Sequence, residues 1–275
     1  MSTAISFGVF ADAHYADRVY ADRYCKDSAD KLSQAVATFN EQHVPFLVDL
    51  GDRTDAWSTA ETEKAGAAGV NELLSAFNGE CYHVLGNHDL ASLTKHEFLA
   101  MHVSRYRQPY YSFDAGEFHF IVLDANCLED GSDFAAGNFS WDLCWVSESQ
   151  LAWLVKDLES AGSRKCVVFL HENLDFRLWE GNLDPHVVQN HEQIKDILQR
   201  YGNVTAVFQG HCHTGRYSHS GGIHYITISA MVVGPGPSNN SYAIVRLRGD
   251  GSIEVEGYGK QISLSLEAAL FFGKE

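Results

Sequence analysis

The chain has 275 residues and a formal net charge of −16, from 20 lysines and arginines against 36 aspartates and glutamates. This length suits one α/β domain with insertions and allows a sizeable core, so we expect a single domain over residues 1–275. The acidic balance argues against binding to long DNA or RNA, because tracking a phosphate backbone needs clustered lysine and arginine.

The 6 cysteines show no spacing typical of a disulfide framework, and we expect them to be reduced. No positively charged leader precedes the first apolar run, which begins at Ile5. No run approaches the roughly 18 apolar residues of a membrane span. These features favour a cytoplasmic protein without a membrane partner, and they leave the oligomeric state open.

The first ninety residues predict alternating strands and helices. Apolar runs over residues 5–11, 46–50 and 82–85 are typical of buried strands. A helix is expected between the first two runs and ends before Pro45, and a second is expected at about residues 60–77. The apolar face of the first helix follows the spacing i, i+3, i+4, i+7: Leu32, Ala35, Val36 and Phe39. This β-α-β-α-β order predicts a parallel sheet.

The middle of the chain predicts a hairpin and an irregular insertion. Residues 110–114 and 118–124 alternate around a glycine turn, and we expect this hairpin to extend the first sheet. Residues 124–146, called the aromatic insertion below, have no clear periodicity. They contain Phe134, Phe139, Trp141 and Trp145. Such a segment either folds over a site and stacks on a ligand or only packs its own aromatic rings.

The second half predicts two more strand and helix units and a β-rich end. Ser147 with Gln150 and Asn190 with Gln193 are typical of capping boxes, and strands are expected over residues 166–170 and 204–209. Residues 223–229, 242–247 and 253–258 are expected to be consecutive strands of a second sheet packed on the first. The predicted fold is a two-sheet α/β sandwich flanked by helices.

Polar side chains follow five of these apolar runs at their carboxyl ends. They are Asp12 and His14; Asp52; Asn87, His88 and Asp89; His171; and His211 and His213. Ligands of open α/β sheets bind outside the carboxyl ends of strands, so these side chains are expected to form one site. Asparagine oxygen is a weak ligand by itself, which favours a metal site where nearby carboxylates supply the charge.

The ordered motifs D-x-H, G-D, G-N-H-D, H and G-H-x-H resemble the signature of the calcineurin-like metallophosphoesterases. The segments 7–17, 221–225 and 238–241 also resemble the branch that includes manganese-dependent ADP-ribose/CDP-alcohol diphosphatases. The resemblance implies a two-sheet sandwich with a dimetal site at the strand ends. It also implies hydrolysis of a phosphodiester or diphosphate bond in a small nucleotide-like substrate.

The resemblance further implies which residues hold two metal ions, with manganese or iron favoured and zinc a further option. Asp52 would bridge the ions, which together can clamp the attacking and leaving oxygens of phosphoryl transfer. The remaining ligands would be Asp12, His14 and His213 for one ion, and Asn87, His171 and His211 for the other.

Three further residues are assigned catalytic roles. The resemblance implies that His88 protonates the leaving oxygen or stabilises the phosphoryl group, and an imidazole has a suitable pKa for a general acid. Asp89 would orient His88 or a metal ligand. Arg53 would either hold a phosphate oxygen or form a salt bridge with Asp17 or Asp55.

Two other functions compete with this prediction. A phosphomonoesterase or protein phosphatase would use the same metals, although an acidic surface without an evident peptide groove makes it less attractive. A non-catalytic scaffold of the same fold would have lost ligands, and the complete ligand set argues against it. Residues 172–185, called the acidic loop below, depart from the diphosphatase branch directly after His171. With the aromatic insertion, this loop is expected to wall the site into a pocket for a compact substrate.

Overall fold

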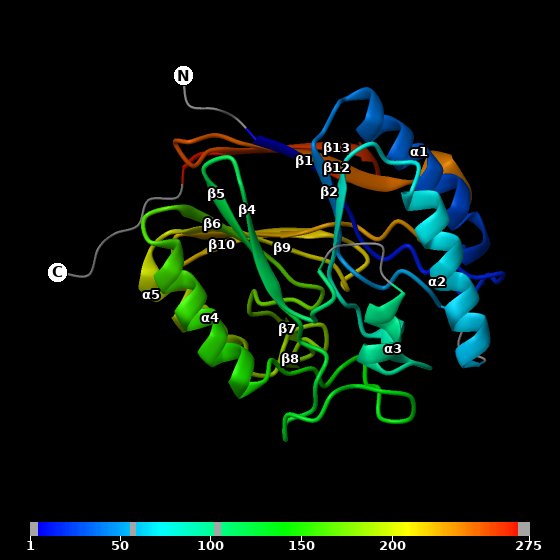
Figure 1. Cartoon of the computed structure of the whole chain (residues 1–275), viewed down its shortest axis with the longest axis horizontal. Helices are drawn as coiled ribbons and strands as arrows, with labels where there is room; N and C mark the ends of the chain where they lie inside the picture. Colours follow the sequence, from blue (N-terminus) through cyan, green and yellow to red (C-terminus); the bar gives the residue numbers. More distant parts are fainter. Residues whose placement is uncertain (1–4, 56–58, 102–105, 269–275) are drawn as a thin grey trace.

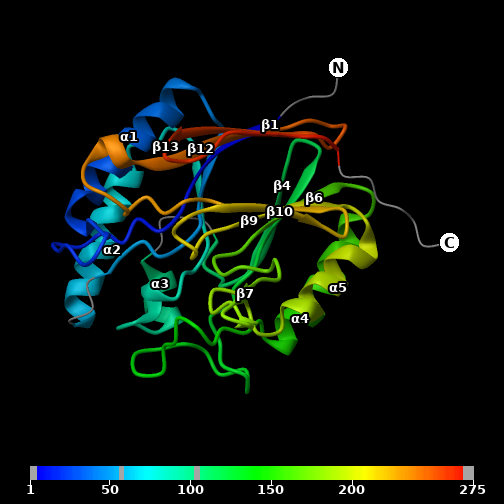
Figure 2. The same ribbon diagram turned by 180° about the vertical axis from the view of Figure 1, so that it is seen from behind.

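The computed structural model describes residues 5–55, 59–101 and 106–268, which form two six-stranded sheets and a two-stranded hairpin. The two large sheets pack face to face, and helices cover their outer faces (Figures 1 and 2). This arrangement confirms the predicted two-sheet α/β sandwich flanked by helices. Among the described residues, no helix combines the length and apolar composition that crossing a bilayer requires.

The first sheet combines strands from both ends of the chain, in the order β14-β13-β12-β1-β2-β3. Its central strands β1, β2 and β3 are parallel, as predicted, while β1 pairs antiparallel with β12. The bounds are β1 Ile5–Phe10, β2 Phe46–Asp49, β3 Glu80–His83, β12 Ser241–Leu247, β13 Ile253–Gly259 and β14 Leu264–Leu266.

The second sheet has the order β10-β11-β9-β6-β5-β4. The strands β5, β6 and β9 are buried at nearly every position, because the first sheet covers one face and helices cover the other. The bounds are β4 Tyr111–Ala115, β5 Phe118–Val122, β6 Lys165–Phe169, β9 Val204–Gln209, β10 Arg216–Ser220 and β11 Ile223–Thr227.

Two expectations about the sheets are wrong. The hairpin β4–β5 extends the second sheet and not the first, because β5 pairs in parallel with β6. The C-terminal strands do not form a sheet of their own: β10 and β11 join β9, whereas β12, β13 and β14 complete the first sheet. Apolar strands with similar patterns can pair at any open sheet edge, so these partners depend on long-range packing.

Helices α1 (Ser28–Glu41) and α2 (Ala60–Leu74) cover the first sheet, and α4 (Glu148–Ala161) and α5 (His191–Tyr201) cover the second (Figures 1 and 2). The predicted apolar face of α1 is buried, from Leu32 to Phe39. The short helix α3 spans Lys95–Ala100.

The two expected helix caps have different outcomes. The Ser147 side chain accepts a hydrogen bond from the Gln150 amide nitrogen at 3.3 Å, which confirms the cap of α4. Asn190 makes no side-chain cap of α5, so that expectation is wrong. Its Oδ1 atom instead accepts a hydrogen bond from the Val146 backbone nitrogen at 3.0 Å, and its Nδ2 atom donates to the Val146 carbonyl oxygen at 2.8 Å. These two bonds join the end of the aromatic insertion to α5.

A buried histidine ties the β4–β5 hairpin to α4. The His119 ring nitrogens lie 2.7 Å from Asp114 Oδ1 and 2.8 Å from Asp157 Oδ2. Burial lowers the pKa of His119, but the hydrogen bonds with Asp157 and Asp114 outweigh burial and raise this pKa above its usual 6.5. The protonated form therefore stabilises the fold.

We expect His119→Asn to reduce the free energy of unfolding by on the order of 1 kcal/mol at pH 5. The wild-type advantage should be complete below about pH 6.5 and should disappear as pH rises through the raised pKa of folded His119. Urea unfolding from pH 5 to pH 9 measures the difference in the free energy of unfolding between wild type and variant. His96→Asn, at an exposed position, is the control. A difference that is constant across this range would contradict the role of His119.

Candidate dimetal site

The predicted ligands converge from both sheets at one end of the sandwich. Asp12 and His14 follow β1, Asp52 follows β2 and Asn87 follows β3, all in the first sheet. His171 follows β6, and His211 and His213 follow β9, both in the second sheet. The site therefore lies between the strand ends of two sheets, and not at the edge of a single open sheet.

The loops that carry these side chains have an unusual backbone. Asp12, His14, Asp52 and His211 all have positive φ angles, between 45° and 64°. Residues other than glycine seldom adopt this conformation, and such backbone strain is concentrated at functional sites. It turns each side chain sharply at the end of its strand.

Two glycines let the loops after β2 and β3 touch. A Cβ atom at Gly51, whose φ is 97°, would lie 2.6 Å from the Gly86 nitrogen, and a Cβ atom at Gly86 would lie 2.2 Å from the Asp52 nitrogen. Any side chain at either position would force the loops apart. The glycines of the G-D and G-N-H-D motifs thus bring Asp52 against the Asn87 loop.

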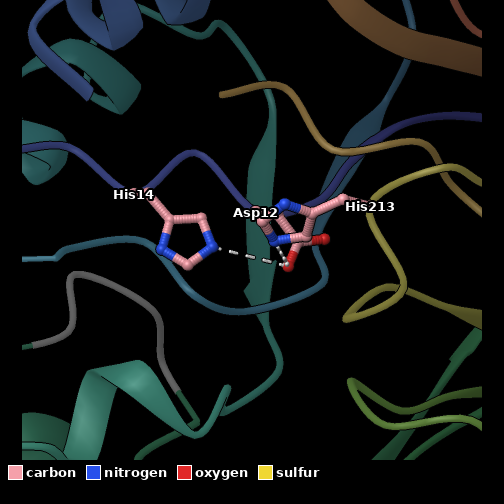
Figure 3. A group of neighbouring side chains, drawn as sticks. All are labelled: Asp12, His14 and His213. Atoms are coloured by element: carbon pink, nitrogen blue, oxygen red, sulfur yellow. Dashed lines mark ion pairs between the residues drawn. The ribbon is translucent and has the colours of Figure 1, made fainter. Parts of the chain in front are cut away.

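One group of candidate ligands consists of Asp12, His14 and His213 (Figure 3). The Asp12 Oδ1 atom lies 3.7 Å from His14 Nε2 and 3.7 Å from His213 Nε2. A ligand atom from each of the three residues lies within 4.8 Å of the others, an arrangement that could hold a metal ion.

The second group consists of Asp52, His171 and His211, again with ligand atoms within 4.8 Å of one another. The Asp52 Oδ2 atom lies 3.2 Å from His171 Nε2 and 3.6 Å from His14 Nε2. A single carboxylate oxygen therefore stands between the two groups. This is the position that a bridging ligand requires.

Buried polar atoms without partners support a metal at each group. Within the described residues, Asn87 Oδ1, Asp12 Oδ1 and His171 Nε2 are buried and accept or donate no hydrogen bond. Unpaired buried polar atoms are costly, and a coordinated cation would satisfy them. Oxygen and nitrogen donors of this kind fit manganese, iron or zinc.

The electrostatics of Asp52 and His213 suit cation binding. Burial raises the pKa of Asp52, but the charges of His171, His88 and His14 outweigh burial and hold that pKa well below its usual range. Burial lowers the pKa of His213 to about 4, so its ring is neutral and can donate a lone pair. Burial also lowers the pKa of His14 and His171, but neighbouring carboxylates outweigh it and raise the first to about 9 and the second well above its usual value. These two rings would therefore have to lose a proton when an ion binds.

A second contact orients each of three candidate histidine ligands. The His171 Nδ1 atom lies 2.7 Å from the Leu50 carbonyl oxygen, and the His211 Nε2 atom lies 3.0 Å from the Trp141 carbonyl oxygen. The His14 Nδ1 atom lies 3.5 Å from Asp55 Oδ2. The opposite nitrogen of each ring is left for an ion.

His88 lies beside these groups, and sequence reasoning missed its main partner. Its Nδ1 atom is 3.2 Å from Asp55 Oδ1, and its backbone nitrogen donates to Asp52 Oδ1 at 2.8 Å. Asp55 also forms ion pairs with Arg18 and Arg23, each at 3.2 Å. The signal in the sequence was a carboxylate three residues after Asp52, which we considered only as a partner for Arg53.

Asp89 holds the loop that carries Asp52. Its carboxylate accepts hydrogen bonds from the backbone nitrogens of Asp52, Arg53 and Gly86, at 3.1, 2.8 and 3.0 Å. Burial, with the charges of Asp52 and Asp49, raises the pKa of Asp89 to about 8. Of the two roles expected for Asp89, its contacts fit the orientation of a candidate ligand.

Among the described residues, Arg53 pairs with Asp49 and not with Asp17 or Asp55, so the expected salt bridge is wrong. Its side chain is fully buried, with Nε 2.9 Å from Asp49 Oδ2 and an Nη2 hydrogen bond of 2.7 Å to Asn71 Oδ1. The alternative role, contact with a phosphate oxygen, stays a prediction that this burial does not favour. The side chain runs beneath the loop toward α2, where Asp49 compensates its charge.

Glu172 is a further residue that sequence reasoning did not place at the site. It follows His171 directly and is 1% exposed, and within the described residues neither carboxylate oxygen has a hydrogen-bond partner. Burial raises its pKa to about 7. From the sequence, this residue is only one of the acidic residues of the acidic loop.

The aromatic insertion and the acidic loop both reach the candidate site. The His186 ring lies 5.1 Å from the His211 ring and 5.6 Å from Trp141. Trp179, in the hairpin of β7 (Leu178–Trp179) and β8 (Asn182–Leu183), stacks on His186 at 6.3 Å. Trp141 and Trp179 are 44% and 51% exposed, so both present ring surface to solvent. The Trp141 ring lies 6.5 Å from the His211 ring, whereas Trp179 contacts His186.

Comparisons with known proteins agree with this geometry. Residues 5–215 match the family model for calcineurin-like phosphoesterases. The chain is 28% identical to the manganese-dependent ADP-ribose/CDP-alcohol diphosphatase of Oryza sativa subsp. japonica, over 89% of this chain and 88% of the relative. It is also 28% identical to the serine/threonine-protein phosphatase CPPED1 of Bos taurus, over 67% and 58% of the two chains. A dimetal phosphatase from Danio rerio has the same fold, with a TM-score of 0.81, 22% identity, and coverage of 96% and 99%.

We expect Asp52→Asn to lose metal and to lower hydrolysis by several orders of magnitude. Removing the charge between the two groups leaves two cations facing each other across a short gap with less compensation. Metal analysis of the purified variant and turnover of a chromogenic phosphodiester measure the effect. The exposed Asp130→Asn, in the aromatic insertion, serves as control. Wild-type metal content together with wild-type turnover in Asp52→Asn would refute the dimetal assignment.

Proposed function

Because the chain belongs to the calcineurin-like phosphoesterase family, we propose that it hydrolyses a phosphodiester or diphosphate bond in a small nucleotide-like substrate with the help of two metal ions. The observation that carries the proposal is Asp52 Oδ2, which lies 3.6 Å from His14 Nε2 and 3.2 Å from His171 Nε2. One carboxylate is thereby shared by two groups of metal-binding side chains. Two ions so placed can activate water and stabilise a transferring phosphoryl group.

The proposed ligands are those of the two groups, with Asn87 added to the second. Asp12, His14 and His213 would hold one ion; Asn87, His171 and His211 would hold the other; and Asp52 would touch both. Manganese is the metal we propose, because similar diphosphatases carry manganese dependence in their names. Iron and zinc fit the same donors and are tested by metal reconstitution.

His88 is the proposed general acid. Asp55 lies at its Nδ1 atom, so a proton on this nitrogen is stabilised and the ring is held in one orientation. The cationic ring, protonated on both nitrogens, would then donate its Nε2 proton to the leaving oxygen and remain as the neutral ring with its proton on Nδ1. Asp89 would act indirectly, by holding the backbone around Asp52.

The substrate is proposed to be compact. Trp141 offers a ring face beside His211 and Trp179 one beside His186, and both suit a base or another flat group. The net charge of −16 disfavours polyanions such as nucleic acid. The likeness to CPPED1 keeps a protein phosphatase as the second candidate, although a folded phosphoprotein would have to reach the metals past both loops.

We also propose that residues 1–275 form one domain, since β1 near one end of the chain pairs with β12 near the other. A cytoplasmic location is proposed from the cysteines, all six of which are free thiols in the structure. A panel of cyclic nucleotides, ADP-ribose, CDP-alcohols, glycerophosphodiesters, monoesters and a phosphoprotein tests the substrate class. Failure to cleave any of them with manganese, iron or zinc would refute the proposed function.

We expect His88→Ala to keep its metal and lose turnover in a manner that depends on the leaving group. A general acid matters most for a poor leaving group, so an alkyl phosphodiester should lose more activity than a p-nitrophenyl diester. Metal content and kcat for both substrates measure it. His96→Ala, which changes an exposed side chain of α3, is the matched control. Equal losses on both substrates would favour electrostatic stabilisation over proton donation.

We expect Trp141→Ala and Trp179→Ala to raise KM for a nucleotide-like substrate by roughly tenfold, because each removes a stacking face of about 1–3 kcal/mol. The KM for bis-p-nitrophenyl phosphate should change less, since this substrate needs no wall. The exposed Ile262→Ala is the control. Unchanged KM values in both variants, or rapid dephosphorylation of a phosphoprotein, would count against a walled site.

A further inference from the structure

We propose that Phe139 positions His88 for proton donation, so that the aromatic insertion supplies a positioning residue and does not only form a wall for the substrate. The inference rests on the proposed function, because that function assigns proton donation to His88. It concerns a different element of the chain, however, since Phe139 is 51 positions from His88 and lies in an irregular segment.

The contact between the two rings is direct. Their centroids are 5.5 Å apart with the planes at 65°, so one ring presents its edge to the other. Such edge-to-face pairs have a preferred geometry and resist rotation. The His14 ring contacts His88 in the same way, at 4.7 Å and 83°. Asp55 at Nδ1, His14 and Phe139 all restrict the His88 imidazole, and Phe139 comes from the insertion.

Phe139 is itself held from behind. Its ring lies 6.4 Å from the ring of Phe134, which is fully buried. Phe139 packs against the same hydrophobic cluster as Leu85 and Leu90, which flank the His88 loop on both sides. The ring is thus wedged between the protein core and the imidazole.

The insertion is anchored to the loop that carries His88. Asn126 donates a hydrogen bond from Nδ2 to the Leu85 carbonyl oxygen at 2.9 Å, directly before the G-N-H-D motif. Lys95 joins Asp124 and Asp133 across the base of the insertion, at 2.6 and 2.7 Å. Buried and part-buried ion pairs of this kind hold backbone segments in register.

The same stretch also reaches a candidate metal ligand. The Trp141 carbonyl oxygen lies 3.0 Å from His211 Nε2, two residues along the chain from Phe139. This contact occupies Nε2 and leaves Nδ1 to face the group formed with Asp52 and His171. Residues 139–141 therefore contact both the proposed acid and a proposed ligand. A displaced acid costs rate steeply, because a shift of about 1 Å can lower turnover by about 100-fold.

The test compares Phe139→Ala with two controls. Phe139→Leu retains bulk against the imidazole, and Leu143→Ala removes an exposed side chain from the same insertion. For Phe139→Ala we expect wild-type metal content, unchanged KM, and kcat for an alkyl phosphodiester lowered about 10- to 100-fold. The p-nitrophenyl diester should lose less. Phe139→Leu should recover most of the rate, and Leu143→Ala should match the wild type.

A double variant tests whether Phe139 acts through His88. In the His88→Ala background, Phe139→Ala should cause no further loss; multiplied losses would overturn the proposal. NMR of the His88 imidazole gives a readout that needs no turnover. Loss of the Phe139 ring current shifts the Cε1–H resonance in both variants, so the linewidth is compared: the line should broaden in Phe139→Ala and stay sharp in Phe139→Leu. If no phosphoester is cleaved, the proposed function fails, and the NMR result alone decides whether Phe139 orders His88. An unchanged linewidth in Phe139→Ala would overturn the positioning role.

Discussion

The close approach of two loops around Asp52 is the constraint on which the rest of the site depends. Gly51 and Gly86 carry no Cβ atom, and this lets the loops after β2 and β3 touch. Asp89 then ties the two loops together by accepting three backbone hydrogen bonds. Asp52 is carried at this junction with a left-handed backbone, and its carboxylate stands between side chains delivered by both sheets.

This junction concentrates buried negative charge, and positively charged or hydrogen-bonding side chains compensate that charge in two places. Beneath the loop, Asp49 pairs with the buried Arg53 and lies 3.3 Å from His83 Nδ1. At the site itself, Asp12, Asp52 and Asp55 face the imidazoles of His14, His171 and His88. Buried carboxylates without such partners would be protonated or would destabilise the fold. Cations at the two groups would complete this compensation.

The histidines differ in the partner of their second ring nitrogen, and this partner sets the chemical role of each ring. A carbonyl oxygen behind His171 and another behind His211 each fix one nitrogen and free the other as a ligand. Asp55 serves two rings at once, His14 and His88. The aromatic insertion supplies one of these contacts, because the Trp141 carbonyl oxygen lies against His211 Nε2. A segment without regular secondary structure therefore helps to orient a candidate metal ligand.

The sequence by itself determined most of the local elements and pointed to candidate ligands that the structure brings close together. Apolar runs and helical periodicity depend on neighbouring residues, and the polar motifs at strand ends predict a shared site because parallel strands end at the same edge. Tertiary structure alone decided which sheet each strand joined, because edges with the same apolar pattern can accept any of them. It also decided that Arg53 turns inward to Asp49 and that Asp55, not Asp89, stands behind His88. The direction of a side chain after a residue with left-handed backbone depends on which distant segments pack against it. The contact of Phe139 with His88 likewise exists only once residues far apart in sequence are brought together.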